Sequence, residues 1–324
     1  LAHNAGVKVH CTVNIMPRND EAAALPAYLE QLDAAGVDAL ILADLGAFRM
    51  AGKYAPHCQR HVSTQQSVAN YACAQSWFDL GASRVVLARE LSLQEIIDIR
   101  ERVSPELELE TFCHGAMCVS YSGRCLLSNY MTGRDSNRGQ CAQPCRYQYA
   151  LMEEKRPGEF FPVFEDEKGT YIMNSRDMCM IDHLDELCDA GIDCLKIEGR
   201  AKSAYYAALV TGAYRHVLDD VWEGHTPDKI WRDEVEHVSH RHYSTGFYYG
   251  YPGQFTENSR YLREWQICAV VETCDAGGNA VLSLRNKFAA GDTVEVVGPD
   301  LRPFLWQVPP MEDSDGVPLL DGDE

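Results

Sequence analysis

A cysteine-rich stretch in the middle of the chain holds the residues whose type and spacing point most directly to chemistry. Cysteine thiolates ligate metal ions and iron–sulfur clusters, and reactive thiols act as nucleophiles. Six residues separate Cys118 from Cys125, fifteen separate Cys125 from Cys141, and three separate Cys141 from Cys145. One more cysteine, Cys179, follows in SRDMCMI. The cysteines concerned are Cys118, Cys125, Cys141, Cys145 and Cys179.

This spacing leaves three interpretations open. Zinc sites usually pair ligands about two to four residues apart, twice over, and only Cys141 and Cys145 in CAQPC have that spacing. The C-x3-C-x2-C run of radical enzymes is absent, because CAQPCRY stops after two cysteines. Four thiolates from separated loops can still hold an iron–sulfur cluster. An iron–sulfur cluster, a zinc site, and unligated core or reactive thiols are therefore alternatives.

Charged residues at two predicted strand ends form a second candidate site. In ELETFCHG, Glu110 and His114 lie on the same side of a strand, because side chains alternate between the two faces. In CLKIEGR, the same alternation groups Lys196, Glu198 and Arg200. Enzymes built on parallel barrels keep their sites at the carboxyl ends of strands. These residues are therefore candidates for catalysis or ligand binding, and the alternative is a layer of satisfied salt bridges.

Further polar strand ends support a ligand pocket at the same rim. HVSTQQSV contributes His61 and Gln65, and NSRD contributes Asn174 and Arg176. Several polar groups that converge on one rim are typical of a small-molecule site. The sequence has no H-E-x-x-H or G-x-S-x-G motif, no P-loop and no G-x-G-x-x-G, so common hydrolase and nucleotide-binding signatures are missing.

Composition and charge narrow the class of protein. The chain has 324 residues, 13 cysteines and a formal net charge of −19, with 46% hydrophobic residues. No apolar run reaches the roughly 20 residues of a membrane span, so we expect a cytoplasmic protein without membrane contact. A net negative charge opposes non-specific binding to nucleic acid. The cysteine-rich stretch differs, because between Cys118 and Ala150 it carries four arginines and one acid.

The elements that position these residues alternate between short apolar strands and amphipathic helices, a pattern typical of a parallel sheet covered by helices. We predict strands over 7–14, 37–44, 60–65, 83–90, 107–115, 170–175 and 192–200. Seven strands are one fewer than a (β/α)8 TIM-type barrel has. We therefore predict an α/β barrel whose first βα unit is missing, in a fragment of a longer protein. An open doubly wound sheet is the alternative.

The sequence pattern changes near residue 262, and this change indicates a second domain. The stretches 264–275, 279–286 and 292–298 are β-rich, lack a helical period and are separated by glycine-containing turns. We predict a barrel domain over 1–255, with a cysteine-rich insertion at 115–170, and a small antiparallel β domain over 262–324.

The motifs ETFCHGAMC, SGRC, YIMNSRDMCMI and GIDCLKIEGR resemble the U32 family, long catalogued as collagenase-like peptidases. Within that family the chain is most similar to the branch that hydroxylates the wobble uridine of tRNA. The resemblance implies a barrel fold, a [4Fe–4S] cluster and prephenate as the source of the hydroxyl group. It places the cluster on Cys118, Cys125, Cys141 and Cys179, with Cys145 as the rival for Cys141.

The same resemblance assigns catalytic roles to the rim residues, which are Glu110, His114, Lys196, Glu198 and Arg200. Arg176 stands where the family usually has lysine. The resemblance also implies contact with the tRNA anticodon loop, through the arginines of the insertion and through Tyr121, Tyr147 or Tyr149, and a homologous U32 partner subunit. A U32 peptidase and a non-catalytic RNA-binding scaffold with structural zinc are the two alternative functions.

Overall fold

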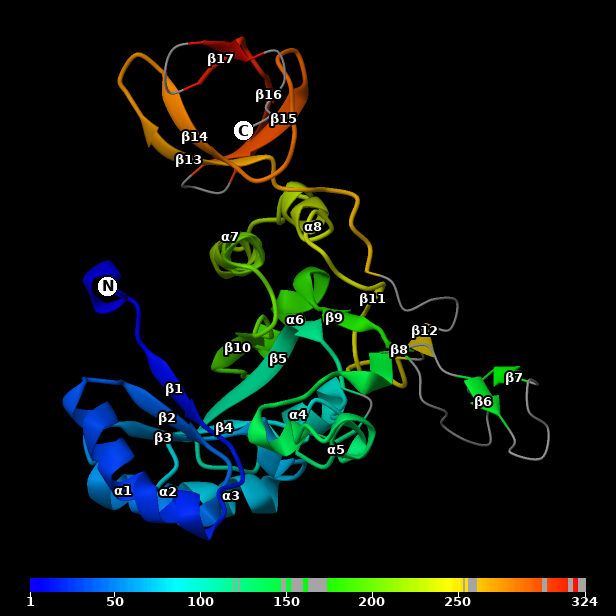
Figure 1. The fold of residues 1–324 in the computed structure, drawn as a ribbon. Helices are drawn as coiled ribbons and strands as arrows, with labels where there is room; N and C mark the ends of the chain where they lie inside the picture. The colour runs from blue at the N-terminus through cyan, green and yellow to red at the C-terminus, as the bar shows by residue number, and fades with distance from the viewer. Residues whose placement is uncertain are drawn as a thin grey trace. The chain divides into compact units, whose positions relative to one another are not determined.

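The computed structural model describes residues 1–118, 120–121, 123–146, 150–152, 160–162, 174–252, 254–255, 261–298, 302–313 and 317–319. Two compact units divide the chain (Figure 1). The first unit comprises residues 1–200 and 241–260, and the second comprises residues 201–240 and 261–324. This grouping puts residues 201–240 with the C-terminal strands, whereas the sequence analysis put them in the first domain.

The first unit is built on one mostly parallel sheet. Its strands are β1 (His10–Val13), β2 (Ala39–Leu42), β3 (Gln59–Val62), β4 (Arg84–Val86), β5 (Glu108–Ala116), β9 (Asp177–Cys179), β10 (Cys194–Ile197) and β11 (Tyr243–Ser244). The order is β1-β2-β3-β4-β5-β9-β11, and β10 also pairs with β5. Strand β2 is buried at all four positions, as expected for a strand covered on both faces.

Helices follow the strands of this unit and cover one side of β1 to β3 (Figure 1). They are α1 (Asn19–Ala34), α2 (Leu45–Tyr54), α3 (Tyr71–Asp79), α4 (Leu93–Arg100), α5 (Leu127–Thr132) and α6 (Leu184–Asp189). Three of them begin at a polar residue that caps the first turn: Asp44, Asn70 and Ser92 each accept a backbone N–H three residues on. Such caps fix the point where each strand-to-helix loop ends.

Short elements complete the first unit. The 3-10 helices are η1 (His3–Ala5), η2 (Thr64–Gln66), η3 (Ser136–Arg138), η4 (Pro144–Arg146) and η5 (Ile181–His183). Two small antiparallel ladders lie outside the main sheet and pair β6 (Ala150–Met152) with β7 (Phe160–Pro162), and β8 (Asn174–Ser175) with β12 (Gln254–Phe255).

The parallel α/β architecture is confirmed, with one difference at the strand after the insertion. The sequence predicts a strand over 170–175; residues 170–173 lie outside the described part, and β8 pairs only with β12. Strand β9 instead joins the main sheet, antiparallel to β5, with Asp177 opposite Ala116. The insertion returns the chain at the end where β5 stops, which gives antiparallel pairing. Within the described residues β1 and β11 are not paired, so a closed barrel stays a prediction.

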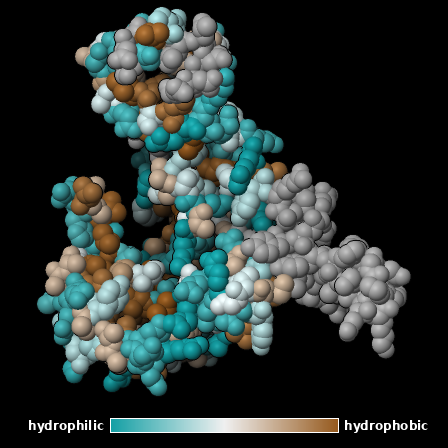
Figure 2. Space-filling view, viewed as in Figure 1, coloured by the Kyte–Doolittle hydropathy of each residue, from teal (hydrophilic) through white to brown (hydrophobic). Residues whose placement is uncertain are grey.

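The second unit combines two helices with antiparallel strands. The helices are α7 (Ala204–Glu223) and α8 (Ile230–Glu234). The strand pairs are β13 (Ala269–Cys274) with β14 (Ala280–Leu284), β15 (Thr293–Val297) with β16 (Pro303–Gln307), and β17 (Met311–Glu312) with β18 (Pro318–Leu319). Hydrophobic residues reach the surface over β13 to β16 (Figure 2), among them Val271, Val281 and Leu305.

Candidate functional site

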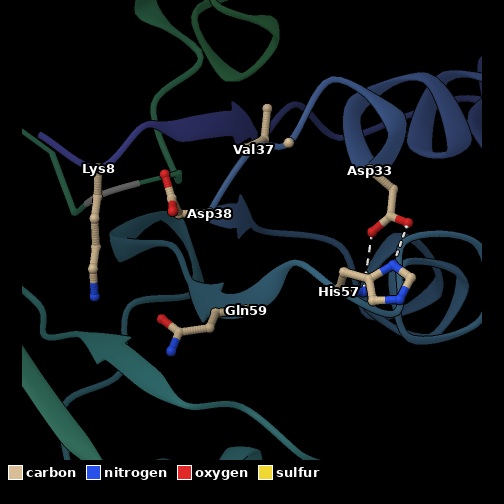
Figure 3. Close-up of a pocket in the computed structure, with 7 residues that line it drawn as sticks. Lys8, Asp33, Val37, Asp38, His57 and Gln59 are labelled. Carbon is tan, nitrogen blue, oxygen red and sulfur yellow. Dashed lines mark hydrogen bonds and ion pairs between the residues drawn. The ribbon is translucent and has the colours of Figure 1, made fainter. Parts of the chain in front are cut away.

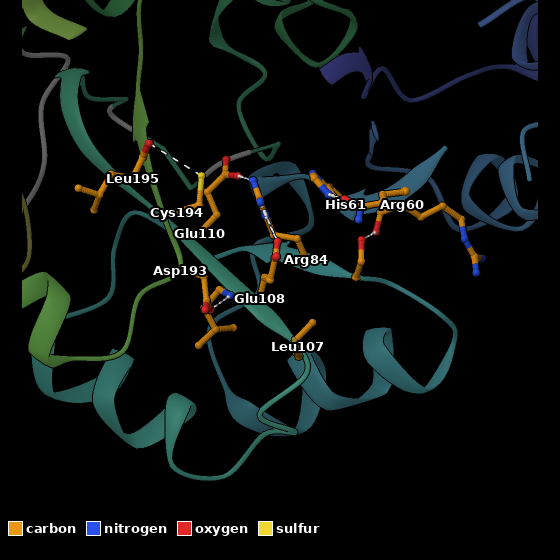
Figure 4. A network of polar contacts seen from close by, with 12 residues as sticks. Arg60, His61, Arg84, Leu107, Glu108, Glu110, Asp193, Cys194 and Leu195 are labelled. Carbon is orange, nitrogen blue, oxygen red and sulfur yellow. Dashed lines mark hydrogen bonds and ion pairs between the residues drawn. The ribbon is translucent and has the colours of Figure 1, made fainter. Parts of the chain in front are cut away.

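A buried carboxylate, Glu110 on β5, is the centre of a polar network that spans three strands (Figure 4). Its Oε1 accepts a hydrogen bond from Nζ of Lys196 on β10 at 2.8 Å, and its Oε2 accepts one from Nη1 of Arg84 on β4 at 3.0 Å. Burial by itself would raise the pKa of Glu110, but the charge of Lys196 and the hydrogen bonds from Lys196 and Arg84 outweigh it and lower the pKa. Glu110 is therefore ionised.

Neutral groups extend this network toward β1 and β3. His61 on β3 is fully buried and packs edge-to-face against His10 at a ring separation of 4.9 Å. Burial, and then the nearby charge of Arg84, lowers the pKa of His61 to about 3. Burial and Glu110 raise the pKa of the Cys194 thiol to about 12. At neutral pH both side chains are uncharged, so they offer hydrogen bonds and not charge.

Phe112 separates two cations on the same face of β5. Nζ of Lys196 lies 5.5 Å from the centre of the Phe112 ring, and the guanidinium of Arg89 lies 4.6 Å from it. Arg89 also donates to the carbonyl of Ala116 at 3.1 Å and to Sγ of Cys118 at 3.5 Å. Arg89 thus connects the polar network to the first cysteine of the insertion. Arg89 is not among the residues predicted from the sequence, although it lies at the end of the predicted strand 83–90.

His114 occupies the end of the same row and is almost completely buried. Its Nε2 lies 3.3 Å from the hydroxyl of Tyr243 on β11, and its carbonyl accepts the backbone N–H of Glu198 at 2.8 Å. The next residue, Gly115, has a φ of +111°, and an added Cβ would overlap the carbonyl oxygen of Glu198. The close approach of β5 and the end of β10 therefore requires a glycine here. Tyr243 was also missed, because its two-residue strand leaves no sequence pattern.

Glu198 and Arg200 lie beyond the end of β10. The register of β10 against β5 shifts between Lys196 and Ile197, which interrupts the alternation expected from the sequence. Oε1 of Glu198 accepts the backbone N–H of Arg200 at 3.0 Å. Nη2 of Arg200 donates to the carbonyl of Gly139 in the insertion at 2.9 Å. These two residues therefore fasten the insertion beside the site, whereas Lys196 contacts Glu110 directly.

The cysteines of the insertion are distributed over its loops. Cys118 and Cys141 are exposed, and Cys125 and Cys145 are half-buried. Sγ of Cys141 accepts the backbone N–H of Gln143 at 3.3 Å. The carbonyl of Cys125 accepts hydrogen bonds from Ser136 and Asn137 at 2.7 and 3.1 Å, which hold the loop in a compact form. Sulfurs that accept hydrogen bonds from Arg89 and from a backbone amide suit an iron–sulfur cluster, whose potential depends on such bonds.

Cys179 differs from the others because it is buried within β9. The register puts Cys179 opposite His114, whereas Cys118 lies four residues further along and near Ser175, whose hydroxyl donates to the carbonyl of Met117 at 2.8 Å. Cys118 itself lies two residues beyond the end of β5. In the described part of the chain, no three of these sulfurs lie within 4.8 Å of one another. The predicted ligand set stays a prediction.

The arginines of the insertion differ in their exposure to solvent and in their ion pairing. Arg124 and Arg134 are exposed, whereas Arg138 forms an ion pair with Glu21 on α1. The side chain of Arg146 lies outside what the structure describes. Tyr121 is exposed, and Tyr147 and Tyr149, also predicted to stack on a base, lie outside the described residues.

A surface pocket lies at the opposite end of the sheet (Figure 3). Its lining includes Lys8, Asp38 and Gln59, which precede or begin strands β1, β2 and β3. Asp33 accepts two hydrogen bonds from His57 beside it, at 3.0 and 2.9 Å. Ligands of parallel α/β folds bind at the carboxyl ends of strands. This pocket is at the amino ends, whereas Arg89, His114 and Glu198 lie at or beyond the carboxyl ends of β4, β5 and β10. The row that runs from Glu110 to these residues is therefore the better candidate. None of the described helices is long and apolar enough to cross a membrane.

Fold and site together define an α/β protein with a buried polar network within its parallel strands and a cysteine-bearing insertion that follows the carboxyl end of β5. The chain belongs to peptidase family U32: residues 1–258 match the profile of the family, and residues 263–321 match that of the U32 C-terminal domain.

Three relatives are similar to this chain over 69% to 99% of its residues. The tRNA hydroxylation protein P1 of Bacillus subtilis is 37% identical over 326 residues, which cover 98% of this chain and 76% of the relative. The tRNA hydroxylation protein P of Escherichia coli is 35% identical, over 99% of this chain and 81% of the relative. The 23S rRNA 5-hydroxycytidine C2501 synthase of E. coli is 36% identical, over 69% of this chain and 32% of the relative.

Proposed function

We propose that this protein hydroxylates RNA, and specifically C5 of the wobble uridine of tRNA. The observation that carries the proposal is the similarity over nearly the whole chain to proteins named for tRNA hydroxylation. The rRNA relative is named for a 5-hydroxycytidine product, which is the same change at the same ring position of a pyrimidine. The position of the cysteine insertion against the polar network, through Arg89 and Cys118, supports a redox site there.

We further propose a [4Fe–4S] cluster on the predicted set Cys118, Cys125, Cys141 and Cys179, in a (β/α)8-type barrel. Such a cluster supplies redox chemistry that side chains lack. Cys145 is the rival of Cys141 for the third position of this set. It lies on η4, which packs beside α5 and β8, and β8 contains Ser175, the neighbour of Met117. The insertion alone therefore carries four thiols on the Cys118 side of the site.

Prephenate is the proposed co-substrate, and the described residues suit a dicarboxylate. Lys196 and Arg89 face Phe112 from the same site and can give paired, charge-assisted hydrogen bonds. Glu110 holds Lys196 and Arg84 in position and stays ionised, so its role is orientation. His114, with Tyr243 at 3.3 Å, is the proposed proton-transfer group. Arg200 and Glu198 fix the insertion over the site.

The peptidase alternative has less support from the described site. A cysteine nucleophile needs a lowered pKa, whereas burial raises the pKa of both Cys113 and Cys194. The zinc-scaffold alternative requires several ligands around one ion, and the cysteines within the described residues do not form such a group. Hydroxylation therefore remains the function that the site and the comparisons support best.

The decisive experiment is mass spectrometry of tRNA nucleosides from a strain that lacks this gene and any paralogue. Complementation with the wild-type gene should restore nucleosides derived from 5-hydroxyuridine. Cys118→Ser should reduce them at least tenfold, because it removes a cluster ligand. Cys58→Ser is the matched control: this thiol lies near Asp33, at the opposite end of the sheet, and should restore them fully. Unchanged nucleosides in the deletion strain would refute the assignment.

Anaerobic purification of serine variants then tests the ligand set. Iron content and visible absorption should fall in Cys118→Ser, Cys125→Ser and Cys179→Ser. Comparison of Cys141→Ser with Cys145→Ser identifies the third ligand, because only one of them should lose the cluster. A colourless wild-type protein whose stoichiometric zinc is lost in the cysteine variants would support the scaffold, and gelatin cleavage that depends on one Ser or Cys would support the peptidase.

A further inference from the structure

Three potential metal ligands converge in the second unit. Glu234 ends helix α8, His237 follows it by three residues, and Glu295 lies on strand β15. One ligand atom from each of the three residues lies within 4.8 Å of the other two. Two short stretches of chain, about sixty residues apart, therefore contribute to one cluster of nitrogen and oxygen donors.

Glu234 lacks the surroundings that a buried carboxylate normally has. Its side chain is 1% exposed, and among the described residues no hydrogen-bond donor meets its Oε2. Burial raises the pKa of Glu234 to about 7, and the negative charge of Glu295 is the second cause of this rise. Burying a carboxylate beside a second one is costly unless positive charge compensates it. The one cationic candidate within the cluster is His237.

His237 does not compensate these carboxylates by hydrogen bonding. Its Nδ1 lies 3.4 Å from Oε1 of Glu234 and 3.2 Å from Oε1 of Glu295, yet within the described region Nδ1 makes no hydrogen bond. Metal–ligand distances of about 2.0–2.2 Å, at tetrahedral or octahedral angles, give ligand–ligand separations of about 3.0–3.5 Å. Both separations from His237 fall within that range, and all three ligand atoms lie within 4.8 Å of one another, which is close enough for one ion to contact all three.

The neighbouring aromatic residues fix this arrangement. The ring of His237 stacks on Trp265 with centres 3.9 Å apart and an angle of 27°, which restrains the orientation of the imidazole. Tyr205 on α7 lies close enough to feel the charges of Glu234 and Glu295; burial first, and then these charges, raise its pKa to about 12. Its phenol therefore remains protonated and can donate a hydrogen bond at the edge of the cluster.

We propose that Glu234, His237 and Glu295 form a divalent metal site in the second unit. Two carboxylates and one imidazole suit first-row ions such as Mn²⁺ or Zn²⁺, and the fourth position would be filled by water. Since the ligands come from α8 and its following loop on one side and from β15 on the other, the bound ion joins the helical part of this unit to its antiparallel strands. The site has a structural role and is independent of the hydroxylation chemistry.

Mn²⁺ titration followed by electron paramagnetic resonance tests the proposal. Mn²⁺ is the probe because it prefers oxygen and imidazole ligands and binds thiolates poorly, which separates this site from the cysteines. Chelator-treated wild-type protein should bind one Mn²⁺, and Mn²⁺ should raise its thermal unfolding temperature. His237→Gln and Glu295→Gln should each weaken binding at least tenfold and abolish the thermal shift.

The matched control is His183→Gln, which removes the histidine of the half-buried His183–Glu186 pair, 2.8 Å apart, and should leave Mn²⁺ binding unchanged. Circular dichroism without metal establishes that the variants fold. Absence of Mn²⁺ binding to the folded wild-type protein, or equal binding by folded Glu295→Gln, would overturn the proposal. In either case the three residues form only an ion-paired cluster.

Discussion

At the scale of single residues, the site depends on which of its buried side chains are ionised and which are neutral. Glu110 is ionised because Lys196 and Arg84 each satisfy one of its oxygens. His61 and Cys194 lie in the same region without such partners and are neutral. The network thus keeps charge where it is paired and excludes it elsewhere, which makes a rigid frame for an anionic ligand.

The neutral state of His61 predicts a dependence of stability on pH. Its pKa is about 3 in the folded protein and 6.5 in the unfolded chain. The unfolded chain therefore binds a proton first, and folding stability falls as the pH drops below 6.5, by about 2 kcal/mol between pH 7 and pH 5. The free energy of unfolding of His61→Gln, measured by urea denaturation at each pH, should not show this part of the loss.

The control for this measurement is His225→Gln, at an exposed position of the second unit, which should keep the pH dependence of the wild type. If His61→Gln and the wild type lost stability in parallel between pH 7 and pH 5, the imidazole would already be charged in the folded protein.

At the scale of elements, β5 organises the site, because β4, β9 and β10 all pair with it. Gly115 near its end permits the contact with Glu198, and we predict that Gly115→Ala destabilises the protein. Gly250→Ala is the matched control: its φ of +122° is similar, but nothing lies within 4 Å of an added Cβ. Both variants carry backbone strain, and only Gly115→Ala adds the clash.

Equilibrium unfolding in urea should therefore show a larger loss for Gly115→Ala than for Gly250→Ala, by about 1–3 kcal/mol. Equal losses would mean that β10 moves freely away from β5 and that the glycine is needed only for its backbone angle.

Much of this element pattern follows from the sequence alone. Strands β1, β2, β4 and β10 lie within predicted ranges, and β3 and β5 each extend one residue beyond theirs. Buried parallel strands are recognisable because they are rich in apolar residues. The pairing of Glu110 with Lys196 also follows, since alternation puts both side chains on the same face. Arg89 and Tyr243 could not be predicted as site residues from the sequence, because their roles depend on contacts between distant segments. The antiparallel β9 depends on where a long insertion returns, which no local pattern encodes.

At the scale of the whole molecule, the net charge of −19 must be reconciled with binding to tRNA. The exposed Arg124 and Arg134 give the insertion a local positive surface. On the proposed function, the double variant Arg124→Gln/Arg134→Gln should weaken tRNA binding and reduce the slope of log K against log salt by about 1.4, or about 0.7 for each charge.

Filter binding at several salt concentrations measures that slope. Arg49→Gln is the matched control, because Arg49 is an exposed arginine on α2 and should leave the slope unchanged. An unaltered slope in the double variant would assign tRNA binding to another surface, without affecting the test of hydroxylation itself.

The three partners of β5 also have a consequence during translation. Strand β4 precedes β5, but β9 and β10 are synthesised only after the insertion. At about 5–20 residues per second, the ribosome needs roughly 4 to 16 seconds to make the eighty residues between the end of β5 and the end of β10. Throughout that time the nascent chain exposes one hydrogen-bonding edge of the nine-residue strand β5, which favours aggregation unless a chaperone covers the edge.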